Sequence, residues 1–406
     1  MTRALLLCPE PLGHRHPAGV GIRFIEIARA LRAVGHQVIV LSPDGGTVDG
    51  CTSAALSPQA IHDHSGAAAV AIVQGHVVNE LIAHGASIPT VVDLYDPFIV
   101  ENLHYYPSRG AEVFNHDHLT LMRSLLRGDF FLCASEAQRM FYLGLLLATG
   151  RVHPLVYQRD PSLRSLLAIA PFGVAPPPPA DTHPAGANVL FGGIYDWYDP
   201  ILAIDAAEMA RARIPGLTLT FTLHPNQEST PQTLATAAQD EVKRRGLADV
   251  VRFEPWFAYE ERAAFYRKFS LAMLCFAPSL ETDLAMRTRI FDYLWGGLPV
   301  ITSPAGGTDT ILGSYSAGVV VRSNRATDFA DAIAGVLSSE DEYRRMREGA
   351  RRWTTDHPWS RTLAPLLDFC SNPKKDETKD LARPLEARLP ESTLLRRIRR
   401  RLGALR

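Results

Sequence analysis

Two arginines lie between Glu281 and Asp292 in the stretch ETDLAMRTRIFDYLWGGLPVI, residues 281–301. Arg287 and Arg289 flank one threonine, and their planar guanidinium groups suit the paired oxygens of a diphosphate. Asp292, one turn into the helix expected there, could accept hydrogen bonds from a ribose diol. Glu281, expected on a loop, could meet the hydroxyls of a second sugar. The structural alternative is an ordinary capped helix with solvated arginines.

Three glycine pairs are expected at turns between a strand and a helix. Glycine lets backbone N–H groups approach an anion, and the N-terminus of a following helix favours negative charge. The first two pairs lack the GxGxxG and GxxxxGKS spacings, which disfavours a dinucleotide oxidoreductase or a P-loop enzyme. Each of these two could equally be a plain tight turn. The pairs are Gly19 with Gly21 in PAGVGIRF, Gly192 with Gly193 in FGGIYDWYDP, and Gly306 with Gly307, followed by Thr308, in SPAGGTDTI.

Further candidates follow the strand expected in PTVVDLYDP, residues 89–97. Asp96 could deprotonate an acceptor or stabilise positive charge on a sugar, although Asp-Pro is also a common opening for a turn. Asp93, Tyr95 and His76 are expected on the same side of a cleft. For a histidine such as His76, a solvated or capping role is the structural alternative.

The elements that must position these residues alternate between short apolar runs and longer helical patterns, which is typical of parallel sheets with crossover helices. Four successive prolines at 176–179 cannot enter a helix or a central strand and favour an extended connector. Trp256, after the last strand residues of VVRFEP, is placed to pack beside a nucleotide base. Strands are expected at 4–8, 37–43, 69–75, 89–97 and 129–136, and then, after the prolines, within 188–200, 217–226, 250–256, 270–276, 298–304 and 318–323.

The prediction is therefore an α/β chain with two doubly wound Rossmann-like domains that face each other across a cleft. Ligands of such sheets bind at the carboxyl ends of the strands, which places the candidate residues in that cleft. The expected boundaries are 1–175 for the N-terminal domain, 176–187 for the linker, 188–370 for the C-terminal domain, and 371–406 for a polar linker and a basic amphipathic helix.

Composition excludes several classes of protein. The chain has 406 residues, of which 46% are apolar and 21% charged. Its formal net charge is −1, so its overall charge does not favour the binding of nucleic acid. The five cysteines are scattered without metal-binding spacing, which predicts no metal site. The first apolar run is too short for a signal peptide, and no stretch approaches a membrane span. A cytoplasmic location is expected.

The chain up to about residue 370 resembles the GT-B glycosyltransferases of the family 4 type, formerly called group 1. The similarity lies in PAGVGIRFIEIARALRAVGHQVIVLSPD, in IAPFGV and in GGLPVITSPAGGTDTI. It implies transfer of a sugar, with retention, from a nucleoside-diphosphate sugar to a saccharide, a lipid-linked saccharide or a small molecule. The donor would be a substrate, and no cofactor or metal is implied. The resemblance also supports an acceptor-side role for Gly19, Gly21 and the DLYDP turn, and a donor-side role for the second domain.

The sequence departs from the family pattern in two places. The family has two glutamates eight positions apart, whereas Glu281 and Asp292 are eleven apart. The segment GGIYDWYDP has no cation where the family has an arginine and a lysine, so Arg287 and Arg289 are the expected replacements. A GT-B epimerase, or a sugar-nucleotide-binding protein that has lost its activity, stays open as an alternative, and few lysines suit a phosphorylase.

The C-terminal stretch LPESTLLRRIRRRLGALR carries six arginines among leucines and one isoleucine. At helical spacing its apolar residues fall on one side, which predicts a basic amphipathic helix. Such a helix either lies on anionic lipid, at the inner face of the membrane, or packs back across the domains. The first case would suit a lipid-linked acceptor.

Overall fold

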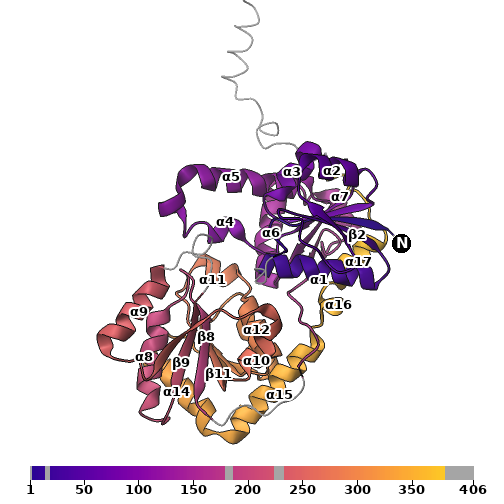
Figure 1. Cartoon of the computed structure of the whole chain (residues 1–406). Coiled ribbons are helices and arrows are strands. Elements are labelled where there is room, and N and C mark those ends of the chain that lie inside the picture. Colours follow the sequence, from indigo (N-terminus) through magenta and orange to yellow (C-terminus); the bar gives the residue numbers. More distant parts are fainter. Residues whose placement is uncertain (1, 14–18, 179–185, 224–232, 380–406) are drawn as a thin grey trace, which may run out of the picture.

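The computed structural model describes residues 2–13, 19–178, 186–223 and 233–379. It contains two sheets of parallel strands, each with helices on both faces (Figure 1). The central strands are apolar and wholly buried, as strands covered on both faces must be. The predicted α/β architecture of two doubly wound domains is confirmed.

The N-terminal sheet has seven strands in the order β3-β2-β1-β4-β5-β6-β7. Strand order reverses beside β1, where Leu5 pairs with Ile39 of β2 on one side and with Ala71 of β4 on the other. A crevice therefore opens beyond the carboxyl end of β1. The strands are β1 (Arg3–Leu7), β2 (Gln37–Ser42), β3 (Thr52–Ala55), β4 (Val70–Val73), β5 (Thr90–Asp93), β6 (Phe130–Cys133) and β7 (Leu167–Ile169).

Seven helices join these strands. Helix α5 is broken at Gly110, whose φ of 74° lies outside the helical region. Ser135 caps α6 by accepting a hydrogen bond from the N–H of Gln138, as its position before the helix predicts. The helices are α1 (Gly19–Ala33), α2 (Pro58–Ser65), α3 (Val77–His84), α4 (Phe98–Glu101), α5 (Tyr106–Arg127), α6 (Glu136–Ala148) and α7 (Pro154–Arg159).

The C-terminal sheet has six strands in the order β10-β9-β8-β11-β12-β13, and its order reverses beside β8. Its strands are β8 (Asn188–Gly193), β9 (Thr218–Leu223), β10 (Val251–Pro255), β11 (Leu271–Leu274), β12 (Val300–Thr302) and β13 (Gly318–Val320). Its helices are α8 (Pro200–Arg211), α9 (Thr233–Arg245), η1 (Tyr259–Glu261), α10 (Arg262–Tyr266), α11 (Leu280–Leu284), α12 (Thr288–Trp295), α13 (Thr308–Tyr315), α14 (Ala326–Ser338) and α15 (Glu340–Asp356).

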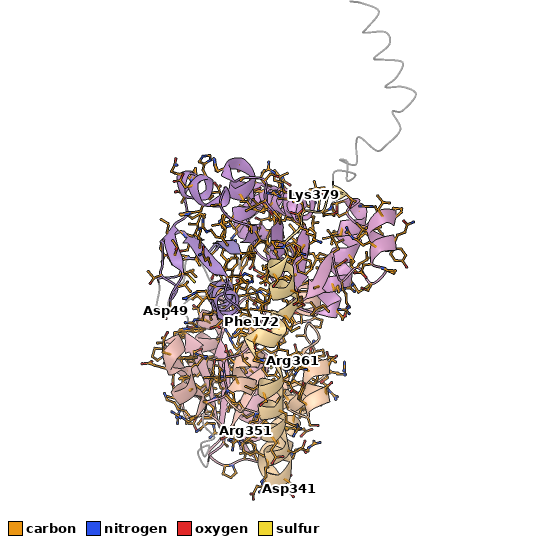
Figure 2. All side chains as sticks on the ribbon, turned by 90° about the vertical axis from the view of Figure 1, so that its right-hand side faces the viewer. Asp49, Phe172, Asp341, Arg351, Arg361 and Lys379 are labelled. Atoms are coloured by element: carbon orange, nitrogen blue, oxygen red, sulfur yellow. The ribbon has the colours of Figure 1, made fainter. Side chains whose placement is uncertain are left out.

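After α15 the chain returns to the N-terminal domain. Figure 2 shows this path from Asp341 through Arg351 and Arg361 to Lys379, with Phe172 at the junction. Helix α16 (Trp359–Thr362) packs against α1 (Figure 1), and helix α17 (Ala364–Ser371) follows it. The ring of Phe369 stacks on Phe130 of the N-terminal sheet at 4.8 Å between centroids. These two helices therefore pack with the N-terminal sheet. The range predicted for the C-terminal domain extends to residue 370 and includes them.

Within the described residues no helix has both the length and the apolar character needed to cross a bilayer. The basic segment expected to form a C-terminal helix lies in residues 380–406, outside the described residues. Its proposed membrane contact is therefore untested by the fold.

Candidate active site

Two cavities lie between the sheets and adjoin one another. The first, here the Trp256 cavity, lies mostly within the C-terminal domain and includes Gly192, Gly193, Arg289 and Asp292 in its wall. The second, here the Asp96 cavity, lies between the DLYDP turn and the segment 285–289. Both walls contain Gly19, Tyr195, Thr288 and Arg289. Part of the predicted set of cleft residues thus lies at two neighbouring positions.

The glycine pair at the end of β8 makes room for a side chain of α12 and for Trp256, which follows β10. Gly192 has a φ of 81°, and a methyl group placed on it would lie 2.5 Å from the hydroxyl of Tyr293. A methyl group on Gly193 would lie 2.6 Å from the ring of Trp256. The expectation that a helix follows this pair directly is wrong, because Gly192 and Gly193 end β8 and α8 begins only at Pro200.

Arg289 is the cation shared by both cavities. Its Nη1 donates a hydrogen bond to the carbonyl oxygen of Gly193 at 2.5 Å, which ties α12 to the end of β8. Its guanidinium carbon lies 5.0 Å from the ring centroid of Tyr195 and 5.9 Å from that of Trp256. A guanidinium held between aromatic rings keeps its charge in a partly dry site and can still bind an anion.

Asp292 lies on the second turn of α12 and lines the Trp256 cavity, as the sequence predicts. Burial raises the pKa of its carboxyl to about 6, although Arg262 and Arg289 oppose this shift by attraction. Ile290, Tyr293 and Leu294 of the same helix are buried and form the face of α12 that packs in the domain core. A carboxylate here can accept hydrogen bonds from hydroxyl groups of a ligand.

Glu281 and Arg287 are paired with each other, which the sequence did not predict. The two guanidinium nitrogens of Arg287 donate to the two carboxylate oxygens of Glu281 at 2.6 and 2.5 Å. Glu281 is buried in helix α11 rather than exposed on a loop, and it lines neither cavity. Arg287 is only 5% exposed but still contributes to the wall of the Asp96 cavity.

Asp96 lies just beyond the end of β5 and shares its cavity with a second carboxyl group. Asp96 and Glu101, the last residue of α4, are hydrogen-bonded through their side chains. Burial is the main cause that raises the pKa of Asp96 to about 6, and the carboxylates of Glu281 and Asp93 add to it. Burial and the nearby Asp96 raise the pKa of Glu101 still further from its usual range. Both carboxyl groups are therefore held in their protonated form to higher pH than an exposed carboxyl group would be.

Two of the other acceptor-side candidates, Asp93 and Tyr95, pack against Arg23. Asp93 is buried and pairs with Arg23 of α1, with Arg23 Nε 2.5 Å from Asp93 Oδ2. Tyr95 is buried against Arg23 and reaches the Asp96 cavity. His76 precedes α3, makes no capping hydrogen bond with its side chain, and lines neither cavity. Of these three predicted residues, the structure brings only Tyr95 to the site.

The first glycine pair begins helix α1. Gly19 lies in the wall of both cavities. The N–H of Gly21, in contrast, donates to the carboxylate of Glu10 at 2.8 Å, so a protein group occupies the donor that was expected to meet an anion. Glu10 lines the Asp96 cavity, and burial raises its pKa.

The third glycine turn supports the wall of the site and lines neither cavity. A methyl group on Gly306 would lie 2.2 Å from the carbonyl oxygen of Ala285, and the N–H of Gly306 donates to the carbonyl of Thr282. Gly307, with φ at 85°, precedes α13. The Thr308 hydroxyl is buried and donates to the carbonyl of Ala305. This turn therefore holds the segment 281–287 in place.

Several residues of the site were missed from the sequence. Glu101 stands five positions after Asp96, at the end of the short helix α4, and its spacing from Asp96 gave no signal that the two side chains meet. Tyr195 and Tyr198 flank Trp197 in a segment that we interpreted only as a glycine turn. Thr222 is buried in the wall of the Trp256 cavity, and its hydroxyl has no hydrogen-bond partner among the described residues.

Comparison with known proteins gives a family match within the C-terminal domain. Residues 235–353 match the family described as glycosyl transferases group 1. The D-inositol 3-phosphate glycosyltransferase of Nocardia farcinica is 26% identical over 171 residues, which are 42% of this chain and 37% of that protein. The corresponding protein of Thermobispora bispora is 28% identical over 193 residues, 46% of this chain and 43% of that protein. This chain spans less than half the length of these curated relatives.

Solved structures match over a larger part of the chain. Anabaena HepE, in complex with UDP and glucose, aligns with a TM-score of 0.65 and 12% identity over 92% of this chain and 100% of that chain. Sucrose-phosphate synthase from Thermosynechococcus elongatus aligns with a TM-score of 0.63 and 14% identity over 91% and 98%. These likenesses show a shared GT-B fold. Together with the family match, they confirm the resemblance to group 1 glycosyltransferases of GT-B fold.

Proposed function

From the GT-B fold of this chain and its group 1 glycosyltransferase region, we propose that the protein transfers a sugar from a nucleoside-diphosphate sugar to an acceptor hydroxyl. The observation that carries this proposal is the pair of adjoining cavities that share Thr288 and Arg289. One cavity has the groups that a nucleotide needs, and the other has carboxyl groups that suit an acceptor. A transferred sugar would lie where the two cavities meet.

The nucleotide would occupy the Trp256 cavity. Trp256 offers an aromatic face to the base, and Asp292 offers a hydrogen-bond acceptor to the ribose hydroxyls. Arg289 would bind the diphosphate, because it is the cation that reaches both cavities. The proposal gains support from Anabaena HepE, which has the same fold and was solved with UDP and glucose. If Asp292 binds the ribose, a nucleoside diphosphate should bind more tightly than its 2′-deoxy form.

Arg287 would contribute positive charge from a fixed position. Its two hydrogen bonds to Glu281 use one edge of the guanidinium group and hold it against the wall of the Asp96 cavity. The buried Nε of Arg287 has no hydrogen-bond partner among the described residues. In this proposal Glu281 orients Arg287 and does not touch the sugar directly.

The chemistry would depend mainly on stabilising the leaving nucleotide. The bond between the anomeric carbon and the diphosphate oxygen breaks, and its electron pair leaves with the diphosphate beside Arg289. The acceptor hydroxyl forms the new bond to the anomeric carbon, and its proton passes to the carboxylate of Asp96. Glu101 would stay protonated and orient Asp96 by hydrogen bonding. We include retention of configuration in the proposal, and NMR of the product would test it.

The acceptor is proposed as a saccharide, a lipid-linked saccharide or a small polyhydroxylated molecule. The curated relatives, whose names give inositol 3-phosphate as their substrate, support a hydroxyl-rich acceptor. Glu10, Asp96 and Glu101 line the Asp96 cavity and can accept hydrogen bonds from such hydroxyls. The protein would act in the cytoplasm, with contact to the membrane through its basic C-terminal segment.

Binding and turnover together test this function. Thermal-shift measurements with nucleoside diphosphates and their sugars would identify the base, because a ligand that binds only the folded state raises the unfolding temperature. Release of the nucleoside diphosphate would then be followed with candidate acceptors. Binding without any turnover would indicate an inactive sugar-nucleotide-binding protein. Turnover that changes the donor sugar without an acceptor would indicate an epimerase.

A further inference from the structure

Gln138 joins three segments of the main chain inside the protein. It lies in the first turn of α6, and its side chain is fully buried. Its Oε1 accepts a hydrogen bond from the N–H of Ala134 at 2.7 Å. Its Nε2 donates to the carbonyl oxygens of Tyr95 at 2.9 Å and of Leu284 at 3.0 Å. Because a backbone N–H only donates and a carbonyl only accepts, these three partners fix which way the amide points.

Two of these partners belong to opposite sides of the cleft. Tyr95 directly precedes Asp96 in the DLYDP turn. Leu284 is the last residue of α11, the helix that also carries Glu281. One amide group therefore links the turn of the proposed base to the helix whose carboxylate holds Arg287.

Helix α11 is held from both domains, although in chain order it lies between strands β11 and β12 of the C-terminal sheet. It packs against α4 and α6 of the N-terminal domain (Figure 1). Leu284 is buried and belongs to the apolar core cluster that contains Ile99 of α4 and Tyr142 of α6. On the other side, the N–H of Gly306 donates to the carbonyl oxygen of Thr282. A shift of α11 would therefore also move residues 285–287, which follow it and line the Asp96 cavity.

Gln138 itself lines neither cavity, so its effect on a ligand must pass through the segments that it holds. Reaction rates depend on such placement, because a displacement of about 1 Å can slow a positioned reaction by about a hundredfold. Hydrogen bonds to buried carbonyl oxygens resist displacement, since a carbonyl that loses its donor is left unpaired away from water. An apolar side chain of the same size would fill the space without this restraint.

We propose that Gln138 is a positioning residue of the transfer reaction, which sets the distance between Asp96 and the Arg287 side chain held by Glu281. An acceptor hydroxyl at Asp96 would thereby meet the anomeric carbon at a fixed separation from the cations. This role in the reaction rests on the proposed function. The link between the DLYDP turn and α11 does not, because it is measured without turnover.

Arg139, the next residue of α6, provides a matched control. It is buried, and its guanidinium group donates to the carbonyl oxygens of Leu167 and Ser162. Both carbonyls belong to the N-terminal domain, and neither residue lines the two cavities. Loss of the Arg139 bonds should therefore lower stability without changing the distance across the cleft.

Kinetics of Gln138→Met and Arg139→Met test the role in the reaction. Methionine keeps about the length and volume of glutamine and removes its hydrogen bonds. With the sugar nucleotide and acceptor that the parent turns over, Gln138→Met should lower kcat at least about tenfold. Its affinity for the released nucleoside diphosphate should equal that of the parent, since Gln138 does not line the Trp256 cavity. Arg139→Met should keep the parental kcat and affinity.

Amide hydrogen exchange tests the link without any ligand. Gln138→Met should speed exchange in residues 281–285 and 94–101, whereas Arg139→Met should leave both segments as in the parent. Gln138→Glu keeps the shape of the side chain and loses at least one donor, so it should give smaller changes in exchange and in kcat. This second variant carries the test if methionine prevents folding.

A folded Gln138→Met protein with the parental kcat would overturn the role in the reaction. Losses of equal size in kcat and in nucleotide affinity would do the same, because they would indicate general damage to the cleft. Unchanged exchange in residues 281–285 would overturn the link itself. A parent that turns over no sugar nucleotide would instead refute the proposed function, and the exchange measurement would still decide the link.

Discussion

The charged residues of the cleft divide into those already paired and those left for a ligand. Arg23 with Asp93, and Arg287 with Glu281, form buried pairs in which each charge is compensated by its partner. Arg289 hydrogen-bonds to a backbone carbonyl and packs on aromatic rings, and among the described residues its charge is attracted by Asp292 without forming an ion pair to a carboxylate. A buried cation of this kind is stabilised when an anion binds beside it. Arg289 is therefore the first residue to test.

Replacement of Arg289 by alanine should remove the charge that stabilises the leaving diphosphate. We expect a loss of about 2–4 kcal/mol of transition-state stabilisation, measured as a fall in kcat/KM for the sugar nucleotide. Arg344→Ala, on an exposed turn of α15, is the matched control and should behave like the parent. Full activity in the Arg289 variant would remove this residue from the proposed site.

Asp96 should make turnover depend on pH. Its carboxyl has a pKa raised to about 6, so it becomes a base only as the pH rises through that value. We expect kcat to increase between about pH 5 and 7 in the parent and to lose this rise in Asp96→Asn. At neutral pH the variant should turn over at least about a hundredfold more slowly with nucleotide affinity retained.

Asp283→Asn is the control for this measurement, because Asp283 is exposed on nearby α11. It should leave both the rate and its pH dependence unchanged. If Asp96→Asn kept the rate and the pH profile of the parent, Asp96 would not be the base and would have only a structural role in the turn. Glu101→Gln keeps a hydrogen-bond donor beside Asp96 and should retain more activity than Glu101→Ala.

The residue types of the site could be predicted from the sequence, but their pairing could not. Arg289 and Asp292 project from one helix, so their position follows from helical spacing and the strand that precedes them. Whether Arg287 meets a ligand or Glu281 depends on the path of the chain between them, which includes the short helix α11. The same holds for Asp93, whose partner Arg23 lies 70 positions away. Contacts of this range depend on the tertiary fold.

At the scale of elements, the end of β8 decides how closely α12 can approach the sheet. The register of β8 against β9 shifts between Leu190 and Gly192, which is a β-bulge. The bulge and the positive φ of Gly192 let the hydroxyl of Tyr293 donate to the carbonyl of Phe191 at 2.8 Å. Bulges next to ligand sites commonly redirect the chain in this way. Arg289 reaches Gly193 because α12 packs so closely.

Gly192→Ala should therefore disturb both stability and nucleotide binding. The left-handed backbone alone costs an alanine about 1–2 kcal/mol, and the added methyl group would also push on Tyr293 and Arg289. Gly216→Ala is the matched control, since Gly216 has a φ of 76° with no atom near its added methyl group. Urea unfolding and nucleotide titration of the two variants would separate strain from crowding. If Gly192→Ala and Gly216→Ala had the same stability and the same nucleotide affinity, the close packing of α12 on the end of β8 would not matter for the site.

The strands that the sequence failed to predict are both at the edge of the N-terminal sheet. β3 (Thr52–Ala55) has small residues and is partly exposed, so it lacks the apolar run that identifies a buried strand. β7 (Leu167–Ile169) has three residues, too few to show a period. The central strands were predicted, because burial on both faces leaves a continuous apolar run in the sequence. The site depends on these central strands, which explains why its location could be predicted.

For the whole molecule, the segment after α15 holds the two domains together. The rings of Phe172, just after β7, and Trp359, at the start of α16, lie 4.5 Å apart and nearly edge to face. Val174 and Pro358 form a parallel bridge at the same crossing. The chain then continues to Asp376, which pairs with Arg151 in the core of the N-terminal domain. The described residues that follow α17 therefore pack on the N-terminal domain.

Asp376→Asn should destabilise the N-terminal domain although the residue is far from the cleft. Arg151 is fully buried, and the change leaves its charge without this carboxylate, with carbonyl oxygens of residues 125, 126 and 128 among its remaining partners. We expect the free energy of unfolding to fall by about 3–5 kcal/mol. Asp331→Asn, which removes the exposed partner of Arg213, should cost about 0–1 kcal/mol.

The pH dependence of stability gives an independent check on Asp376. The Thr378 hydroxyl and Arg151 together outweigh the effect of burial and lower the pKa of this carboxyl below its usual range. The group therefore stabilises the folded state above the pKa of the unfolded chain, and this contribution is lost as the pH falls through the folded pKa. The parent should lose stability on acidification more steeply than Asp376→Asn. Parallel curves of urea midpoint against pH for the two proteins would show that the Asp376 pair does not hold this segment in place.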